Sequence, residues 1–133
     1  MFGRKKLKMR LIGIISLIIF IFVIIFPMIY NINSLHKEHI IRSKIESVAE
    51  KYIKNVERDG YLSYTTYKKI EHEIDQAVSY KGITSYRFIT GTFERKTKGE
   101  EVFIEIDYGA FSLLYNVNVK VIKFGISSYE NKQ

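Results

Sequence analysis

The apolar and polar positions divide the chain into an apolar first segment and a mixed remainder. Residues 11–30 carry no charged side chain, and fifteen of these twenty residues are Ile, Phe, Leu or Val. A helix of about 20 apolar residues is long enough to cross the hydrocarbon core of a bilayer. At roughly −0.3 to −0.6 kcal/mol each, the fifteen side chains favour insertion by at most about 5 to 9 kcal/mol.

We therefore predict a transmembrane helix over residues 11–30. A buried core helix would show a polar face, which this segment lacks. A cleavable signal peptide usually has a shorter apolar region, and no Ala-x-Ala-like site follows position 30, so the sequence favours retention as an anchor. The residues expected to span the membrane include Leu11, Ile15, Ile18, Phe22, Ile25, Pro27 and Tyr30, with Pro27 able to bend the helix and Tyr30 suited to the bilayer interface.

Two amphipathic helices are predicted after this segment. The first has apolar residues at intervals of three and four, continues the membrane helix after a short break at residues 31–34, and ends at Asp59-Gly60. Its apolar positions are Ile41, Ile45, Val48, Ala49, Tyr52, Ile53 and Val56. Ser63 is the expected N-cap of the second helix, which Gly82 closes. The apolar stripe of that helix is Tyr67, Ile70, Ile74, Ala77 and Val78.

The apolar period then changes to two, which is typical of strands. A first strand is predicted over residues 84–94, and the turn residues 96–99 make a β-hairpin with a second strand. The second strand alternates Val102, Ile104, Ile106 and Tyr108 with polar residues and Phe103, and the third places Val117, Val119 and Val121 on one buried face. Residues 127–133 are expected to be a frayed tail.

These elements predict an α+β fold of two layers, in which the two helices cover one face of a three-stranded antiparallel sheet. The expected organisation is a basic cytoplasmic N-terminus at residues 1–10, a transmembrane helix at 11–30 and one extracytoplasmic domain at 31–133.

Charge is concentrated before the apolar segment. The net charge is +7, and five basic residues precede position 11, so the remaining 16 basic and 14 acidic residues carry only +2. A remainder so balanced argues against nucleic-acid binding. By the positive-inside rule the N-terminus should be cytoplasmic. The topology determinants are Arg4, Lys5, Lys6, Lys8 and Arg10.

No pattern typical of catalysis is found in the sequence. Cysteine is absent, no nucleophile elbow or nucleotide-binding loop is present, and neither His36 and His39 nor His72 has the spacing of a zinc site. The carboxylate pairs Glu71 with Asp75 and Glu105 with Asp107 are interpreted as solvated surface. We expect no catalytic residue, cofactor, metal or small-molecule substrate; an enzyme is a third hypothesis, which a ligand-sized pocket with groups of perturbed pKa would support.

Tyrosine is unusually frequent, with ten copies. A tyrosine-rich core is favoured over a dedicated contact surface, although interaction surfaces also use tyrosine in this way. The ten positions are 30, 52, 61, 64, 67, 80, 86, 108, 115 and 129.

The order of a basic start, one apolar helix, an amphipathic helix and a small antiparallel sheet resembles type IV pilins and pseudopilins. At residue level the chain is similar to the TadE-like minor pseudopilins of Gram-positive tight-adherence systems. The residues that carry this resemblance are Ile45-Glu46-Ser47-Val48-Ala49, Gly60-Tyr61-Leu62, Gly99-Glu100-Glu101-Val102 and Ile104-Glu105-Ile106-Asp107-Tyr108. The chain departs from the prepilin pattern of Gly before the cleavage point and Glu five residues after it, because Lys8 follows Gly3 at that distance and Ile18 follows Gly13.

The resemblance implies a non-enzymatic, membrane-anchored accessory component of a pilus-like or secretion assembly. Its expected partners are the lipid bilayer and other membrane or pilus-assembly proteins. The alternative hypothesis is a membrane-tethered extracytoplasmic binding or regulatory protein unrelated to pili, such as an envelope-stress or immunity protein.

Overall fold

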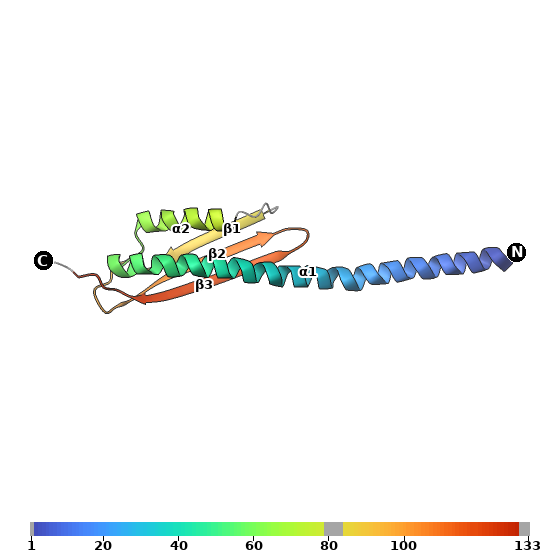
Figure 1. The fold of residues 1–133 in the computed structure, drawn as a ribbon, viewed down its shortest axis with the longest axis horizontal. Helices are drawn as coiled ribbons and strands as arrows, with labels where there is room; N and C mark the ends of the chain where they lie inside the picture. Colours follow the sequence, from blue (N-terminus) through green and yellow to red (C-terminus); the bar gives the residue numbers. More distant parts are fainter. Residues whose placement is uncertain (1, 79–83, 131–133) are drawn as a thin grey trace.

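The computed structural model describes residues 2–78 and 84–130, within which it has two helices and three strands. In chain order these are α1 (Phe2–Asp59), α2 (Tyr64–Ala77), β1 (Thr84–Gly91), β2 (Glu101–Phe111) and β3 (Asn116–Ile126). The N-terminal half of α1 projects far beyond the domain that the other elements form (Figure 1). The predicted α+β fold is confirmed, with strand order β1-β2-β3 and antiparallel pairing throughout.

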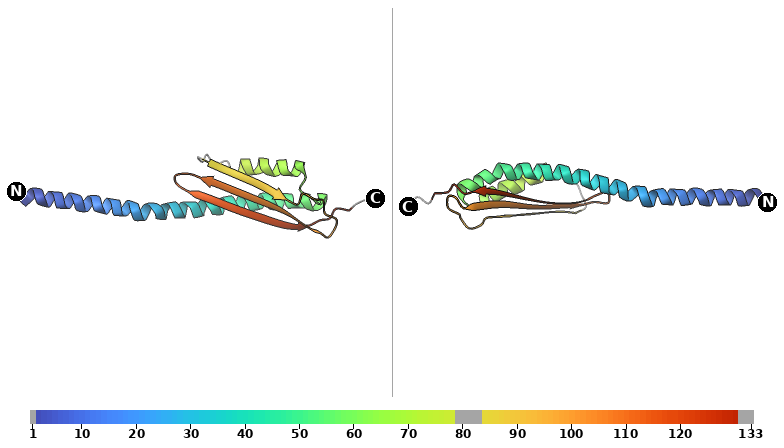
Figure 2. Two further views of the ribbon diagram at one scale, coloured as in Figure 1. Left: turned by 180° about the vertical axis from the view of Figure 1, so that it is seen from behind. Right: turned by 90° about the horizontal axis from the view of Figure 1, so that it is seen from below.

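The helix α1 is continuous over its 58 residues. The short break predicted at residues 31–34 is wrong, because these residues remain helical and bond to the sheet. Pro27 lies inside the helix, which curves gently in this region (Figure 2). Gly60 ends α1 as predicted: its φ is 78°, and its N–H donates a hydrogen bond of 2.8 Å to the carbonyl of Val56.

The second helix begins at the predicted cap. The hydroxyl of Ser63 accepts a hydrogen bond of 3.3 Å from the backbone N–H of Thr66, which satisfies a donor of the first turn. The helix ends at Ala77, and Gly82, the predicted end, lies outside the described residues. Ile70 and Ile74 are fully buried, as expected for the apolar stripe of α2.

The first strand is shorter than predicted and ends at Gly91 instead of Glu94. The reason is a competing partner, the connection between α1 and α2. The carbonyl of Thr92 accepts from the N–H of Leu62 at 2.7 Å, and the N–H of Lys96 donates to the carbonyl of Gly60 at 2.7 Å. Thr92 still bonds to Phe103 of β2, and the chain after Thr92 leaves the ladder and runs along that connection.

The core lies between the sheet and the two helices, which cover the same face of it (Figure 2). The predicted inward faces of β2 and β3 are confirmed by their alternating burial. The α1 residues Ile41, Ile45 and Val56 are fully buried against them. A Cβ atom at Gly125 would lie only 2.8 Å from Cγ of Glu57, so α1 approaches β3 more closely there than a larger residue would allow.

The C-terminal segment is better ordered than predicted. Ser127 is only 2% exposed, its N–H donates to the carbonyl of Glu100 at 2.8 Å, and its hydroxyl donates to the carbonyl of Lys96 at 2.9 Å. The N–H of Ser128 donates to the carbonyl of Glu57 at 2.7 Å. The prediction of a frayed tail is thus wrong for its first residues, and residues 131–133 lie outside the described part of the chain.

Candidate functional site

The most distinctive surface is the apolar segment, which we define as residues 11–30 of α1. Its least exposed large hydrophobic residue before Tyr30, Ile21, is still 42% exposed, so the rest of the domain does not cover it. Among the described residues, α1 is the one helix long and apolar enough to cross a membrane. A core-helix interpretation is excluded, because the apolar stretch is bare on all sides.

The residues predicted to span the membrane all lie on this segment. Leu11, Ile15, Ile18, Phe22 and Ile25 follow one another at intervals of four and three along one side of α1, and each is exposed. Tyr30 is half-buried, because the turn between β2 and β3 reaches it. The five basic residues of the N-terminus are exposed in the first turns of the same helix.

The β2–β3 turn, residues 112–115, meets the end of the apolar segment. The amide Nδ2 of Asn33 donates a hydrogen bond of 3.4 Å to the carbonyl of Leu114. Phe26, Ile29, Tyr30, Asn33 and Leu114 line a small hollow of about 20 Å³ at this junction. The spacing of apolar residues does not predict this contact; its signal in the sequence is the pair Leu113-Leu114 in a turn, where polar residues are usual.

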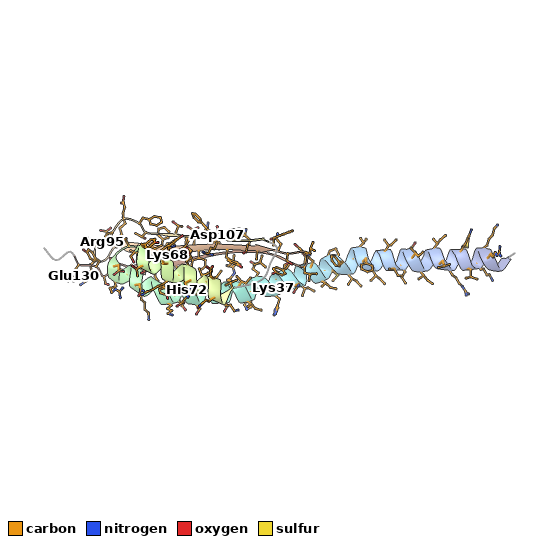
Figure 3. The ribbon with its side chains drawn as sticks, turned by 90° about the horizontal axis from the view of Figure 1, so that it is seen from above. Lys37, Lys68, His72, Arg95, Asp107 and Glu130 are labelled. Atoms are coloured by element: carbon orange, nitrogen blue, oxygen red, sulfur yellow. The ribbon has the colours of Figure 1, made fainter. Side chains whose placement is uncertain are left out.

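Cations lie just beyond the junction. The ammonium of Lys37 lies 3.7 Å from the centroid of the Tyr115 ring, a cation–π geometry. One turn later, Arg42 pairs with Glu38 at 3.1 Å and also donates to the carbonyl of Lys120 at 3.3 Å. Figure 3 shows Lys37 where α1 enters the domain.

The outer sheet face, which the helices leave uncovered, mixes aromatic and charged side chains. It presents Phe88, Phe103 and Phe124 beside Asp107 and Lys120. Phe88 is 64% exposed, and the rings of Phe103 and Phe124 lie 6.3 Å apart. Asp107 lies on the side of the molecule opposite to His72 of α2 (Figure 3). A surface of this composition could contact another protein.

The candidate carboxylates are held in ion pairs. Arg87 of β1 lies between Glu71 and Asp75 of α2, at 3.3 and 2.5 Å, and Glu105 pairs with Lys120 at 2.9 Å. The ion pairs of Arg87 join α2 to β1, and the pair between Glu105 and Lys120 joins β2 to β3. Asp75 and Arg87 line a hollow of about 190 Å³ between α2 and the sheet, where the carboxylate of Asp75 is already paired with Arg87.

One cluster perturbs its members' pKa values. Oε1 of Glu73 accepts hydrogen bonds of 2.6 Å from both the ammonium of Lys51 and the phenol of Tyr52. The bond from Lys51, followed by the bond from Tyr52, lowers the pKa of Glu73. Burial, then the hydrogen bond to Glu73, raises the pKa of Tyr52. The cluster joins α1 to α2 at the surface of the domain.

Other sites for ligands are weakly developed. Within residues 2–78 and 84–130, no group of three or more His, Asp or Glu side chains is arranged to hold a metal ion. A hollow of about 450 Å³ lies between α1 and β3, lined by Glu46, Glu50, Lys123 and neighbouring residues. Its nearest ion pair, between Lys123 and Glu50, is 3.5 Å long.

The tyrosines divide between core and surface. Tyr52, Tyr108 and Tyr115 are buried, and the hydroxyl of Tyr108 donates to the carbonyl of Val78 at 3.2 Å. Tyr64 and Tyr86 are exposed, whereas Tyr80 lies outside the described residues. The predicted tyrosine-rich core therefore accounts for some of these residues and not for others.

Comparison with models of known protein families, with curated proteins and with solved structures finds no match to this chain.

Proposed function

We propose that this chain is a membrane-anchored, non-enzymatic accessory subunit of a pilus-like or secretion assembly, similar to the TadE-like minor pseudopilins. In this role the apolar segment packs laterally against partner helices in the bilayer, and the domain presents a protein-binding face outside it.

The observation that supports this proposal best is the division of one unbroken helix into two environments. Residues 11–29 are apolar and exposed, and the second half packs against the sheet from Ile41 to Val56. Because the helix is continuous, no flexible linker separates the domain from the membrane-spanning segment. Asn33 donates a hydrogen bond to the β2–β3 turn and Ser34 accepts one from the start of β3, and both bonds reinforce that rigidity.

We place the N-terminus in the cytoplasm and residues 31–133 outside the membrane. The support for this orientation is the cluster of five basic residues before Leu11, compared with the mixed charges that follow Lys37. The residues from Leu11 to Tyr30 would extend about 30 Å as a helix, which matches the hydrocarbon thickness of a bilayer.

The non-enzymatic part of the proposal draws on how the charged side chains are used. The carboxylates of Glu71, Glu73 and Glu105 join α2 or β2 to neighbouring elements through ion pairs. These ion pairs give each carboxylate a structural role that does not require a substrate.

A second candidate is a membrane-tethered binding or regulatory protein unrelated to pili. The outer sheet face favours it, because Phe88 and Phe124 are large, apolar and exposed. The absence of an acidic residue before Glu38 favours it as well, since no carboxylate in the apolar segment could neutralise the N-terminal amine of a neighbouring subunit.

Site-specific photo-crosslinking in the native membrane distinguishes the two candidates. A photoreactive residue at Ile18 probes the middle of the apolar segment, one at Phe88 probes the outer sheet face, and one at Glu94 serves as an exposed polar control. The assembly subunit is expected to give a protein adduct at Ile18. Adducts at Phe88 alone, with only lipid at Ile18, would contradict lateral packing and support the tethered binding protein.

The intact mass of the membrane-extracted chain adds an independent result. Loss of a leader ending at Gly3 or Gly13 would indicate prepilin-type processing and support the pseudopilin proposal. A full-length mass together with a lipid-only adduct at Ile18 would overturn it.

A further inference from the structure

The β2–β3 turn carries apolar side chains at its most exposed positions. Leu113 is 75% exposed, Leu114 57% and Phe111, the last residue of β2, 49%. The turn is tight, with the N–H of Ser112 donating to the carbonyl of Tyr115 at 2.9 Å. Turns usually carry Gly, Asn, Asp, Pro or Ser, because these residues suit the backbone and water. The turn residues at the other end of the sheet, Lys96, Thr97, Lys98 and Gly99, contain no apolar side chain.

The position of these residues suggests why they are apolar. Leu114 lines the same hollow as Phe26, Ile29 and Tyr30, which belong to the last turns of the apolar segment. Phe26 precedes Tyr30 by four residues, or about 6 Å along the helix axis. The β2–β3 turn therefore lies alongside the end of the apolar segment and not above it. Figure 1 shows this turn as the part of the sheet that reaches toward the N-terminal half of α1.

The surrounding surface continues the apolar character for a short distance. Ile32 and Leu35 of α1 are exposed, and no formally charged residue occurs between Arg10 and Lys37. The ammonium of Lys37 then lies over the ring of Tyr115, at the base of the turn. An apolar patch bounded by aromatic rings and a cation has the chemistry of the bilayer interface, where lipid tails meet headgroups.

We propose that the β2–β3 turn is a second membrane contact, in which Leu113, Leu114 and Phe111 enter the interfacial layer of the bilayer beside α1. This inference rests on the proposed anchoring of the apolar segment in the membrane. Because α1 and the turn then meet the bilayer at two points, the contact fixes the tilt and rotation of the domain relative to the membrane. The outer sheet face is held at a defined orientation for its partner.

Depth-dependent quenching tests the proposal directly on the full chain. The chain has no cysteine, so single cysteines can be introduced without removing a native one. We would replace Leu113 with cysteine and attach a nitrobenzoxadiazole label. The chain is then reconstituted in phosphatidylcholine vesicles containing phosphatidylglycerol and a nitroxide-labelled lipid. Phe93→Cys is the matched control, since Phe93 is also apolar and exposed but lies on the β1–β2 connection at the far end of the sheet.

The label at position 113 is expected to lose fluorescence to the nitroxide lipid and to resist aqueous iodide, whereas the label at position 93 should show the reverse. Ile18→Cys reports the apolar segment separately. If the label at position 18 is quenched by lipid and the label at 113 is not, the turn contact is wrong and the anchor stands. If neither is quenched by lipid, the anchoring itself fails. A label at 113 shielded from both quenchers would mean that a second copy of the chain covers the turn, which also overturns the proposal.

Discussion

The hydroxyl of Ser34 on α1 accepts a hydrogen bond of 3.1 Å from the backbone N–H of Asn116, the first residue of β3. One position earlier, Asn33 donates to the carbonyl of Leu114. Two consecutive helical residues thus hold the β2–β3 end of the sheet. This arrangement explains why α1 stays helical where a break was predicted, and it ties the direction of the apolar segment to that of the sheet.

Replacing Ser34 with alanine removes the acceptor of the Asn116 amide. We expect hydrogen exchange of that amide to accelerate, with a loss of only about 0.5–1 kcal/mol in the free energy of unfolding because the bond is exposed. The measurement is amide exchange by NMR on the full chain in detergent. Ser43→Ala, an exposed serine of the same helix, is the control. Unchanged exchange at Asn116 in Ser34→Ala would show that the bond does not form.

The elements with strong local signals were predictable from sequence. Val117, Val119 and Val121 alternate with polar residues because one side of β3 is dry, and Gly60 and Ser63 have the local chemistry of helix ends. The features that were missed depend on distant partners. Ser34 and Asn116 are 82 positions apart, and the buried Ser127 donates its hydrogen bonds to the carbonyls of residues 96 and 100. Periodicity carries no information on such pairs.

For the candidate site, the apolar segment was predictable from the sequence and its contact with the β2–β3 turn was not. The uncharged run from Leu11 to Tyr30 is apolar on all sides, and the rest of the chain is too small to bury it. Its exposure outside the domain therefore follows from the sequence. The junction with Leu114 could not be derived, because it requires the length of β2 and the position of its turn relative to α1.

The bond from Tyr52 to Glu73 should make stability depend on pH. Tyr52→Phe is expected to cost about 1–2 kcal/mol at neutral pH, since a hydrogen bond to a carboxylate is lost. Hydrogen bonds from Lys51 and Tyr52 lower the pKa of Glu73 in the folded state. Stability gained from such a group is present above its unfolded pKa and is lost as pH falls through its folded pKa.

The difference between wild type and Tyr52→Phe should therefore shrink in acid, measured by chemical denaturation across that pH range. Tyr61→Phe, which keeps the ring beside Arg95, controls for loss of a hydroxyl. A difference that stays constant from neutral to acidic pH would argue against a charged acceptor.

Gly60 and Gly99 both have positive φ, at 78° and 93°, but differ in their surroundings. A Cβ atom at Gly60 would collide with the backbone carbonyl oxygen of Lys96, whereas one at Gly99 would meet nothing within 4 Å. Gly99→Ala should cost about 1–2 kcal/mol from backbone strain alone. Gly60→Ala should cost at least about 1 kcal/mol more. Equal losses in the free energy of unfolding would contradict the close packing of the α1–α2 connection.

Leu113 should contribute little to the stability of the domain. Leu113→Asp is expected to change the free energy of unfolding in detergent by less than about 0.5 kcal/mol, because the side chain is exposed. Ile74→Ala, at a fully buried position, should cost about 2–5 kcal/mol in the same assay. A large loss in the free energy of unfolding for Leu113→Asp would mean that the apolar side chains of the turn stabilise the fold and do not serve a membrane contact.

Anchoring by the apolar segment is the central claim, and partitioning of the full chain during alkaline extraction of membranes tests it most directly. One arginine near mid-span costs about 3 kcal/mol of insertion, which the segment can absorb, whereas two cost about 6 kcal/mol and bring the total near zero. We therefore expect wild type and Ile18→Arg to stay in the membrane pellet and Ile18→Arg combined with Phe22→Arg to be released. Release of the wild-type chain, or full retention of the double variant, would contradict the claim.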